Sequence, residues 1–212
     1  MQKPEVQELI YGGLSEALTG TGFRLNRSQE AFARRTTTGR QSLAVPLWDY
    51  QPDFQFSLVA GIRVDAVEDV FNKFSGATGK NATLTLTTMT PLSFFDDSRP
   101  QYEVRTPEEA DRAVEQLKET TRSKIVPFFE EHADTHSLDD VLHTRPQPGF
   151  DITEPFSHAM HALIVARLAG NPDYPSLVAR YAAELTNLHP MLRDRFEGLL
   201  EHLPELEPLP RR

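Results

Sequence analysis

One pair of histidines has the spacing of metal ligands on a helix. His158 and His161 lie three residues apart in a segment with helical periodicity, so both imidazoles can face one side. Glu154 is close in sequence, but it precedes Pro155 and is biased away from helical geometry, so we do not expect it as a third ligand. Two imidazoles alone are more typical of a structural or interfacial pair. We therefore predict no metal here, with metal binding as the alternative.

A second pair, His132 and His136, lies four residues apart where another predicted helix ends. Glu131 or Asp134 could complete a site, but histidine also interacts favourably with the exposed carbonyl groups of a helix C-terminus. We favour that solvated terminus and predict neither a metal nor another cofactor for the chain. A metal-dependent, hydrolase-like enzyme that uses either histidine pair is the alternative.

The remaining chemical motifs are incomplete. The chain has no cysteine, which excludes disulfides, thiolate nucleophiles and thiolate metal sites. Residues 76–81 resemble a phosphate-binding loop, but only two residues separate the glycines and Asn81 replaces the metal-binding hydroxyl. Asp96 and Asp97 stand in a loop where adjacent acids are usually solvated. Since no nucleophile, base and orienting group occur together, we predict no catalytic residue.

A group of aromatic and basic residues suits contact with another protein instead. Trp48, Asp49 and Tyr50 are consecutive, and Trp and Tyr anchor interfaces because they join a large apolar body to a polar group. Arg34 and Arg35 could bind acidic groups of a partner through forked hydrogen bonds. Burial of Trp48 in the core is the alternative to its exposure. We predict these five residues as the partner-binding set.

The composition is that of a globular protein. The 212 residues are 39% hydrophobic and 25% charged, with a net charge of −9. This acidity disfavours binding to nucleic acid or anionic lipid, and no segment approaches the roughly 20 consecutive apolar residues of a membrane-spanning helix. Residues 1–8 lack the apolar core of an export signal. We expect a cytoplasmic protein with a protein partner, and homo-oligomers remain an open alternative.

Alternating apolar residues predict a mostly antiparallel sheet in the first part of the chain. The clearest segment is a single strand over residues 54–63, in which every second residue is apolar. Its buried face is expected to carry Phe54, Phe56, Leu58, Ala60 and Ile62. Further strands are expected within residues 24–37, at 43–47, at 84–86 and at 101–105. Pro46 cannot donate to a ladder, which favours an edge position or a bulge there.

Helices with one apolar face are expected to cover this sheet. The first spans residues 6–18, where Gly12 and Gly13 each weaken the helix by roughly 1 kcal/mol and indicate the close approach of another backbone. Asp65 is expected to cap a short second helix. Thr106 begins the clearest helix, because it precedes a proline and the acid of a capping box, and Pro127 is expected to interrupt its continuation.

The C-terminal part is predicted to be helical. Ser137 is expected to open a short helix, residues 144–155 form a linker, and three helices follow at 156–169, 176–188 and 191–203. Short connections between these helices imply antiparallel neighbours. We predict an α+β domain over residues 1–143, a helical extension over 150–203 that packs on it, and a loose tail over 204–212.

The N-terminal part resembles a known bacterial family. The resemblance rests on Leu-x-x-x-Gly-Phe at residues 18–23, Phe32 with Arg34, Ala60-Gly61-Ile62, and residues 125–130 leading into 137–140. Over about residues 5–143 the chain is similar to domain of unknown function 4304, whose members are uncharacterised. The resemblance implies a fold and no catalytic residue. Together with the contact residues, it leads us to expect a non-catalytic bacterial interaction module of the immunity or adaptor type.

Overall fold

The computed structural model describes residues 1–97, 101–144 and 146–211. It is 55% helical and 17% strand, with mostly antiparallel sheets, which confirms the predicted α+β class. Contacts divide the chain into two compact units: unit 1 comprises Met1–Ile62 and Met89–His132, and unit 2 comprises Arg63–Thr88 and Ala133–Arg212. This division differs from the predicted boundaries, because residues 63–88 group with the C-terminal helices.

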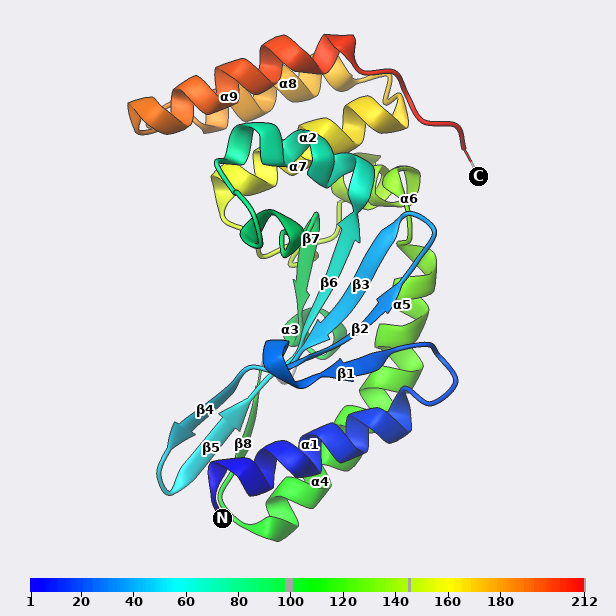
Figure 1. Ribbon diagram of the computed structural model, residues 1–212, viewed down its shortest axis with the longest axis vertical. Helices are drawn as coiled ribbons and strands as arrows, with labels where there is room; N and C mark the ends of the chain where they lie inside the picture. Colours follow the sequence, from blue (N-terminus) through cyan, green and yellow to red (C-terminus); the bar gives the residue numbers. More distant parts are fainter. Residues whose placement is uncertain (98–100, 145, 212) are drawn as a thin grey trace. The chain divides into compact units, whose positions relative to one another are not determined.

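Unit 1 contains most of the strands (Figure 1). Its strands are β1 (Arg24–Asn26), β2 (Ala31–Arg35), β3 (Gly39–Ala44), β4 (Leu47–Tyr50), β5 (Asp53–Phe56) and β8 (Tyr102–Val104), together with most of β6 (Val59–Val64) and β7 (Thr88–Pro91). Its helical segments are α1 (Lys3–Ala17), η1 (Arg27–Gln29), α3 (Leu92–Phe95), α4 (Pro107–Thr120), η3 (Thr121–Ile125) and α5 (Val126–Glu131). The chain enters unit 2 within β6 and returns within β7.

The larger sheet, sheet A, has the strand order β1-β2-β3-β6-β7. Phe32 of β2 lies opposite Leu25 on one side and Leu43 on the other in antiparallel register. Phe32 and Leu43 are buried, as the alternating pattern predicts. Helix α5 is tied to β3 by a hydrogen bond that the side chain of Gln41 in β3 donates to the Phe129 carbonyl of α5.

The smaller sheet, sheet B, has the order β4-β5-β8. Phe56 of β5 lies between Leu47 of β4 and Tyr102 of β8, and its ring stacks on that of Tyr102 at a centroid distance of 5.0 Å. Helix α4 packs next to β8. One face of sheet B is therefore core, and Phe54 and Phe56 are fully buried in it.

The single strand predicted over residues 54–63 is wrong, because β5 ends at Phe56 and β6 begins at Val59, in a different sheet. All five alternating apolar residues are nevertheless buried. The strand predicted at 43–47 is likewise divided, since β3 ends at Ala44 and β4 begins at Leu47. Pro46 lies in this break, and its carbonyl accepts a hydrogen bond from the Ser57 N–H, which lies in the break between β5 and β6. The two segments therefore pass between sheet A and sheet B side by side.

Helix α1 packs against α4 at the glycine pair (Figure 1). A β-carbon at Gly13 would overlap Cγ1 of Val114 and lie 3.5 Å from Cδ of Lys118, whereas one at Gly12 would meet nothing within 4 Å. The predicted close approach therefore exists at Gly13 alone, and side chains of α4 make it. The capping box that Thr106 forms with Glu109 is also confirmed.

The interruption predicted near Pro127 is confirmed as a change of helical winding. Helix α4 passes into the π-helical segment η3, and Pro127 lies in the first turn of α5, where its missing N–H removes no hydrogen bond within that helix. The helical segment therefore continues from α4 through η3 into α5 with altered hydrogen bonding.

Unit 2 is built around α7 (Figure 1). Its helical segments are α2 (Asp65–Ser75), η2 (Asn81–Thr83), α6 (Thr135–Asp139), η4 (Asp140–Thr144), α7 (Pro155–Ala169), α8 (Tyr174–Glu184), α9 (Pro190–His202) and η5 (Leu203–Glu205). Helix α7 contacts α2, α6, α8 and α9, and its residues 159–166 are all buried, as expected for a helix that is apolar on every side. Glu154 caps its N-terminus by accepting the N–H groups of Phe156 and Ser157.

Several local predictions in unit 2 are wrong. The strand expected at 84–86 is absent from the described residues, where η2 ends at Thr83 and β7 begins at Thr88. The N-cap of α2 is Val64 rather than Asp65. Helix α6 begins after Asp134, whose carboxylate accepts two backbone N–H groups, so Ser137 lies inside it.

The predicted loose tail makes hydrogen bonds to unit 2. The N–H of Leu209 donates to the Leu168 carbonyl at 2.7 Å, and the Leu209 carbonyl lies 3.2 Å from Nε2 of His136. Arg167 donates to the carbonyl groups of Leu203 and Pro204. The described residues 203–209 are therefore tied to α7 and α6 through their backbone.

Candidate functional site

Strand β4 forms one edge of sheet B, so one side of its backbone has no strand partner within the described residues (Figure 1). The hydrogen bond from Ser57 N–H to the Pro46 carbonyl fixes the phase of the antiparallel ladder. Because bonded pairs alternate along such a ladder, Trp48 and Gln55 form the next bonded pair. The N–H and C=O groups of Leu47 and Asp49 consequently point away from β5.

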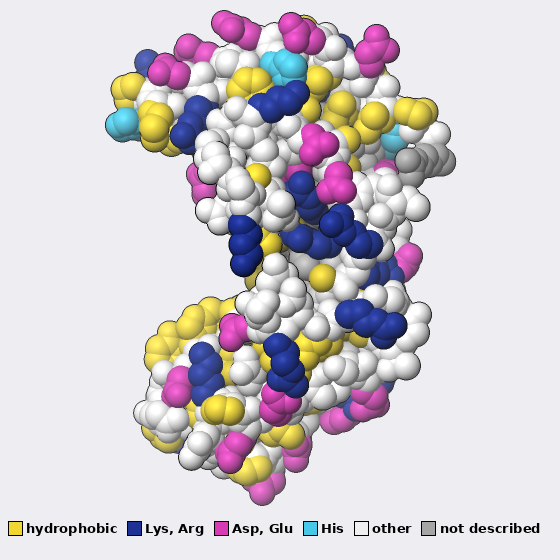
Figure 2. All heavy atoms as spheres, viewed as in Figure 1, with side chains coloured by type: hydrophobic (Ala, Val, Ile, Leu, Met, Phe, Trp, Pro, Cys, Tyr) yellow, Lys and Arg dark blue, Asp and Glu magenta, His cyan; other side chains and the backbone are white. Residues whose placement is uncertain are grey.

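Trp48 and Tyr50 are exposed on the outer face of this edge strand. Trp48 is 41% exposed and Tyr50 is 59% exposed, which resolves the alternative between burial and exposure of Trp48. Trp48 lies opposite Gln55, which in turn lies opposite Glu103, so these side chains share the face away from the core. Figure 2 shows hydrophobic side chains at the surface beside the β4–β5 hairpin.

Acidic side chains lie on all three strands of sheet B. Asp49 and Glu103 are both exposed. Asp53, at the start of β5, is paired with Arg105 through both carboxylate oxygens, and this hydrogen-bonded contact lowers the pKa of Asp53. The side chain of Glu109 accepts the N–H groups of Arg105 and Thr106. Arg105 therefore already has an acidic partner next to sheet B.

Arg34 has a different role from the one predicted. Its guanidinium lies 4.8 Å from the centroid of the Phe23 ring and donates to Oε1 of Gln41 at 2.7 Å, to the Thr21 carbonyl at 2.8 Å and to Glu130 at 2.6 Å. These contacts tie β2 to β3, to the chain before β1 and to α5. Because its donors serve unit 1 itself, we do not include Arg34 in the candidate surface.

Arg35 lies in a different sheet from the predicted aromatic contact residues. Arg35 is exposed at the end of β2, where it lies opposite Arg40 in sheet A. Trp48, Asp49 and Tyr50 lie in sheet B. The five residues predicted as one partner-binding set thus belong to two sheets, and only the three of β4 form a contiguous exposed strand.

His158 and His161 contact different partners in unit 2. Nδ1 of His158 lies 2.8 Å from Oδ2 of Asp151. Nε2 of His161 lies 3.1 Å from Oε1 of Glu68, without the angle of a linear hydrogen bond, and its ring stacks on Phe71 at a centroid distance of 3.8 Å. The two imidazoles therefore do not converge on a common point.

His132 and His136 do not form a pair either. Nδ1 of His132 lies 3.2 Å from the Phe128 carbonyl, and its ring stacks on that of Phe128. His136 belongs to unit 2, where its Nε2 faces the Leu209 carbonyl. Within residues 1–97, 101–144 and 146–211, no group of three histidine, aspartate or glutamate side chains has the arrangement of a metal site.

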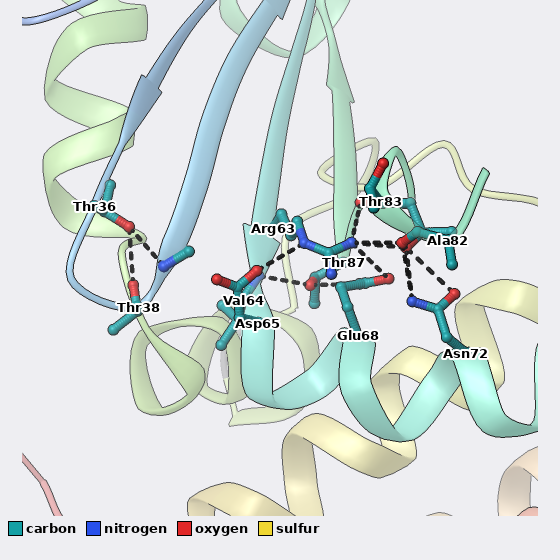
Figure 3. A network of polar contacts seen from close by, with 12 residues as sticks. Thr36, Thr38, Arg63, Val64, Asp65, Glu68, Asn72, Ala82, Thr83 and Thr87 are labelled. Carbon is teal, nitrogen blue, oxygen red and sulfur yellow. Dashed lines mark hydrogen bonds and ion pairs between the residues drawn. The ribbon is translucent and has the colours of Figure 1, made fainter. Parts of the chain in front are cut away.

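A buried polar network in unit 2 was missed by the sequence reasoning (Figure 3). Glu68 of α2 is fully buried, its Oε1 accepts a hydrogen bond from Thr87 at 2.8 Å, and its Oε2 lies 3.9 Å from Nη1 of Arg63. Arg63 also donates to Asp65 at 2.7 Å and to the Thr85 hydroxyl at 2.9 Å. The sequence signal that could have revealed this network was an acidic residue, Glu68, next to Val67 on the apolar face of α2.

The electrostatic setting of Glu68 favours its ionised form. Burial raises the pKa of this carboxyl, but the contacts with His161 and with the hydroxyl groups of Thr85 and Thr87 outweigh burial, so the pKa of Glu68 lies below its usual value. Because the side chain has no access to solvent, the network positions α2, α7 and the segment around η2 and does not form a substrate site.

A second polar cluster surrounds Tyr181 of α8. Nδ1 of His143 lies 2.8 Å from Asp139, whose two carboxylate oxygens accept hydrogen bonds from the Asn171 amide. The Tyr181 hydroxyl lies 3.5 Å from Nε2 of His143, and burial raises the pKa of Tyr181. These contacts join α6, η4 and α8, and the tyrosine is buried, so the cluster too is structural.

Comparisons with protein-family models, with curated proteins and with solved structures found no match to this chain. None of the helices in the described part of the chain combines the length and apolarity needed to cross a membrane. The arrangement of strand β4 is therefore the feature from which a function can be argued.

Proposed function

We propose that this chain is a non-catalytic protein-interaction module that binds its partner through strand β4. The observation that supports the proposal is the exposure of two neighbouring aromatic side chains, Trp48 and Tyr50, on an edge strand. Large aromatic residues contribute much of the binding energy of protein interfaces, and they bury a large area at a low cost in conformational entropy. A role of the immunity or adaptor type would need such a surface and no catalytic group.

The alternative, a metal-dependent enzyme, has no comparable support. Each of its four histidines is engaged by a carboxylate or a carbonyl group within its own unit, as described above. The relation to domain of unknown function 4304, the bacterial origin and the cytoplasmic location stay predictions. They are compatible with an interaction module but add no site residue to it.

Site-specific photo-crosslinking in cells of the source organism tests the proposal. A photoreactive phenylalanine analogue would replace Tyr50, and in a matched control it would replace Met191 of α9, which is 53% exposed and lies in unit 2. We expect a discrete protein adduct from position 50 that is lost in the Trp48→Ala variant, and none of that mass from position 191. Identical adduct patterns from both positions, or no adduct from position 50, would contradict the proposal.

A further inference from the structure

The edge of β4 offers the backbone groups that another strand would need. As argued from the ladder phase, the N–H and C=O groups of Leu47 and Asp49 point outward, and these two residues are one full strand repeat apart. An added strand can bond to both residues at once, which is the mode of peptide recognition known as strand addition. A helix or an irregular loop cannot match this spacing along the edge.

The exposed face beside this edge favours apolar side chains in the added strand. Trp48 and Tyr50 are two residues apart, so both lie on the outer face of sheet B. Every second side chain of an added strand would stand next to this aromatic pair, at the distance over which cross-strand pairs interact. The four residues of β4 set the length, because the edge ends at Pro46 and at the turn after Tyr50.

Charge selects a basic partner. Among residues 46–56 and 101–112 there are six acids, Asp49, Asp53, Glu103, Glu108, Glu109 and Asp111, and two bases, Arg105 and Arg112, which gives 2 − 6 = −4. Arg105 is already bound to Asp53. Asp49 is exposed and lies on the face of β4 opposite to Trp48 and Tyr50, so lysine or arginine at the alternate positions of the added strand would stand on its side and be attracted to it.

A second copy of the chain fits this edge less well. Pairing of β4 with itself would bring two identical acidic surfaces together, and each chain carries a net charge of −9. The register that opposes Asp49 to Asp49 would place like charges directly across the strand pair, which is destabilising. Electrostatics therefore favours a foreign strand over self-association.

We propose, on the basis of the function proposed above, that the partner presents a short extended segment with alternating apolar and basic residues, which adds to sheet B as a strand beside β4. Backbone hydrogen bonds to Leu47 and Asp49 would fix its register. Contacts with Trp48 and Tyr50 would supply apolar burial, and the carboxylate of Asp49 on the other face would select its charge.

Selection from a displayed library of random short peptides tests this inference, with the intact chain as the target. We expect enriched peptides to alternate apolar residues with lysine or arginine, and to bind the Trp48→Ala variant at least tenfold more weakly. Synthetic copies that are N-methylated at alternate residues, and so lack the donors that face β4, should also lose at least tenfold in affinity.

Two substitutions at one position separate backbone pairing from charge. Asp49→Pro removes the outward N–H but is compatible with an edge strand, whereas Asp49→Asn keeps the N–H and removes the charge. Because proline removes the charge as well as the N–H, we expect Asp49→Pro to bind about tenfold more weakly than Asp49→Asn at all salt concentrations. The smaller loss for Asp49→Asn should disappear at high salt. Circular dichroism of both variants establishes that they are folded.

The outcomes distinguish the two proposals. Peptides that need Trp48 but tolerate N-methylation and Asp49→Pro, or that are acidic, would overturn strand addition and leave β4 as the interaction surface. A dimer in solution that Trp48→Ala dissociates would replace the foreign strand by a second copy. A selection that yields no peptide dependent on Trp48 would overturn both proposals.

Discussion

Removal of the buried carboxylate of Glu68 is expected to destabilise unit 2 strongly. Glu68→Leu has nearly the same volume, but it removes the acceptor of the Thr87 hydroxyl and the negative group beside His161 and Arg63. Loss of one partner from a buried charge pair typically costs about 3–5 kcal/mol of the free energy of unfolding. Urea unfolding followed by circular dichroism measures this cost. Asp69→Asn, at an exposed position on the same helix, is the control and should change stability by less than about 0.5 kcal/mol.

A double-mutant cycle with His161→Phe separates the pair from simple packing. The ring at position 161 stacks on Phe71, so phenylalanine preserves the aromatic contact while it removes the imidazole. If Glu68 and His161 stabilise each other, the double variant should be more stable than the sum of the single effects predicts, by about 1–3 kcal/mol. Strict additivity would refute the argument that the pair is coupled.

The pH dependence of stability tests the Glu68 contribution independently. Since the pKa of Glu68 is lowered in the folded protein, its contribution to stability is present above the unfolded-state pKa of about 4.3 and is lost as the pH falls through the lower folded value. The stability difference between the wild-type chain and Glu68→Gln should therefore be constant near neutral pH and shrink in acid. A difference that grows as the pH falls would contradict the assigned direction.

Two further predictions concern unit 1 and use neighbouring residues as controls. Gly13→Ala should destabilise the protein by about 1–3 kcal/mol because its β-carbon would overlap Val114. Gly12→Ala should stabilise it by up to about 1 kcal/mol through helix propensity. Equal effects of the two substitutions would refute the close packing of α1 on α4. Arg34→Met should lower the free energy of unfolding in urea by about 1–3 kcal/mol, because the buried Gln41 side chain loses its hydrogen-bond donor. Arg35→Met, at an exposed position, should lower it less. The reverse order would show that Arg34 does not tie β2 to its neighbours.

Much of the local structure follows from sequence patterns with a direct physical cause. The box from Thr106 to Glu109 supplies its own cap. The alternation from Phe54 to Ile62 correctly predicts that its five apolar residues are buried, although Gly61 on the other face is buried as well. The same alternation cannot show that the chain changes sheets after Phe56, because the inward-facing period continues through the break. Pro46, on the opposing segment, was the one local signal of that break.

The candidate surface and the buried network depend on partners that are distant in the sequence. The exposure of Trp48 follows from the position of β4 at the end of a sheet whose third strand begins at Tyr102. Glu68 meets His161 only because α2 packs on α7. Spacing within the helix placed His158 and His161 on one face, but Asp151 and Glu68 engage them separately, so local periodicity suggested a metal pair that the tertiary contacts do not form.

Quenching of tryptophan fluorescence tests the role of β4 most directly, because Trp48 is the only tryptophan of the chain. Acrylamide is neutral, so the acidic surroundings do not repel it from the indole. The proposed interface predicts strong quenching of the free protein and marked protection once the photo-crosslinked partner or a selected peptide is bound. Quenching that is already weak in the free protein, or that is the same with and without the bound partner, would contradict it.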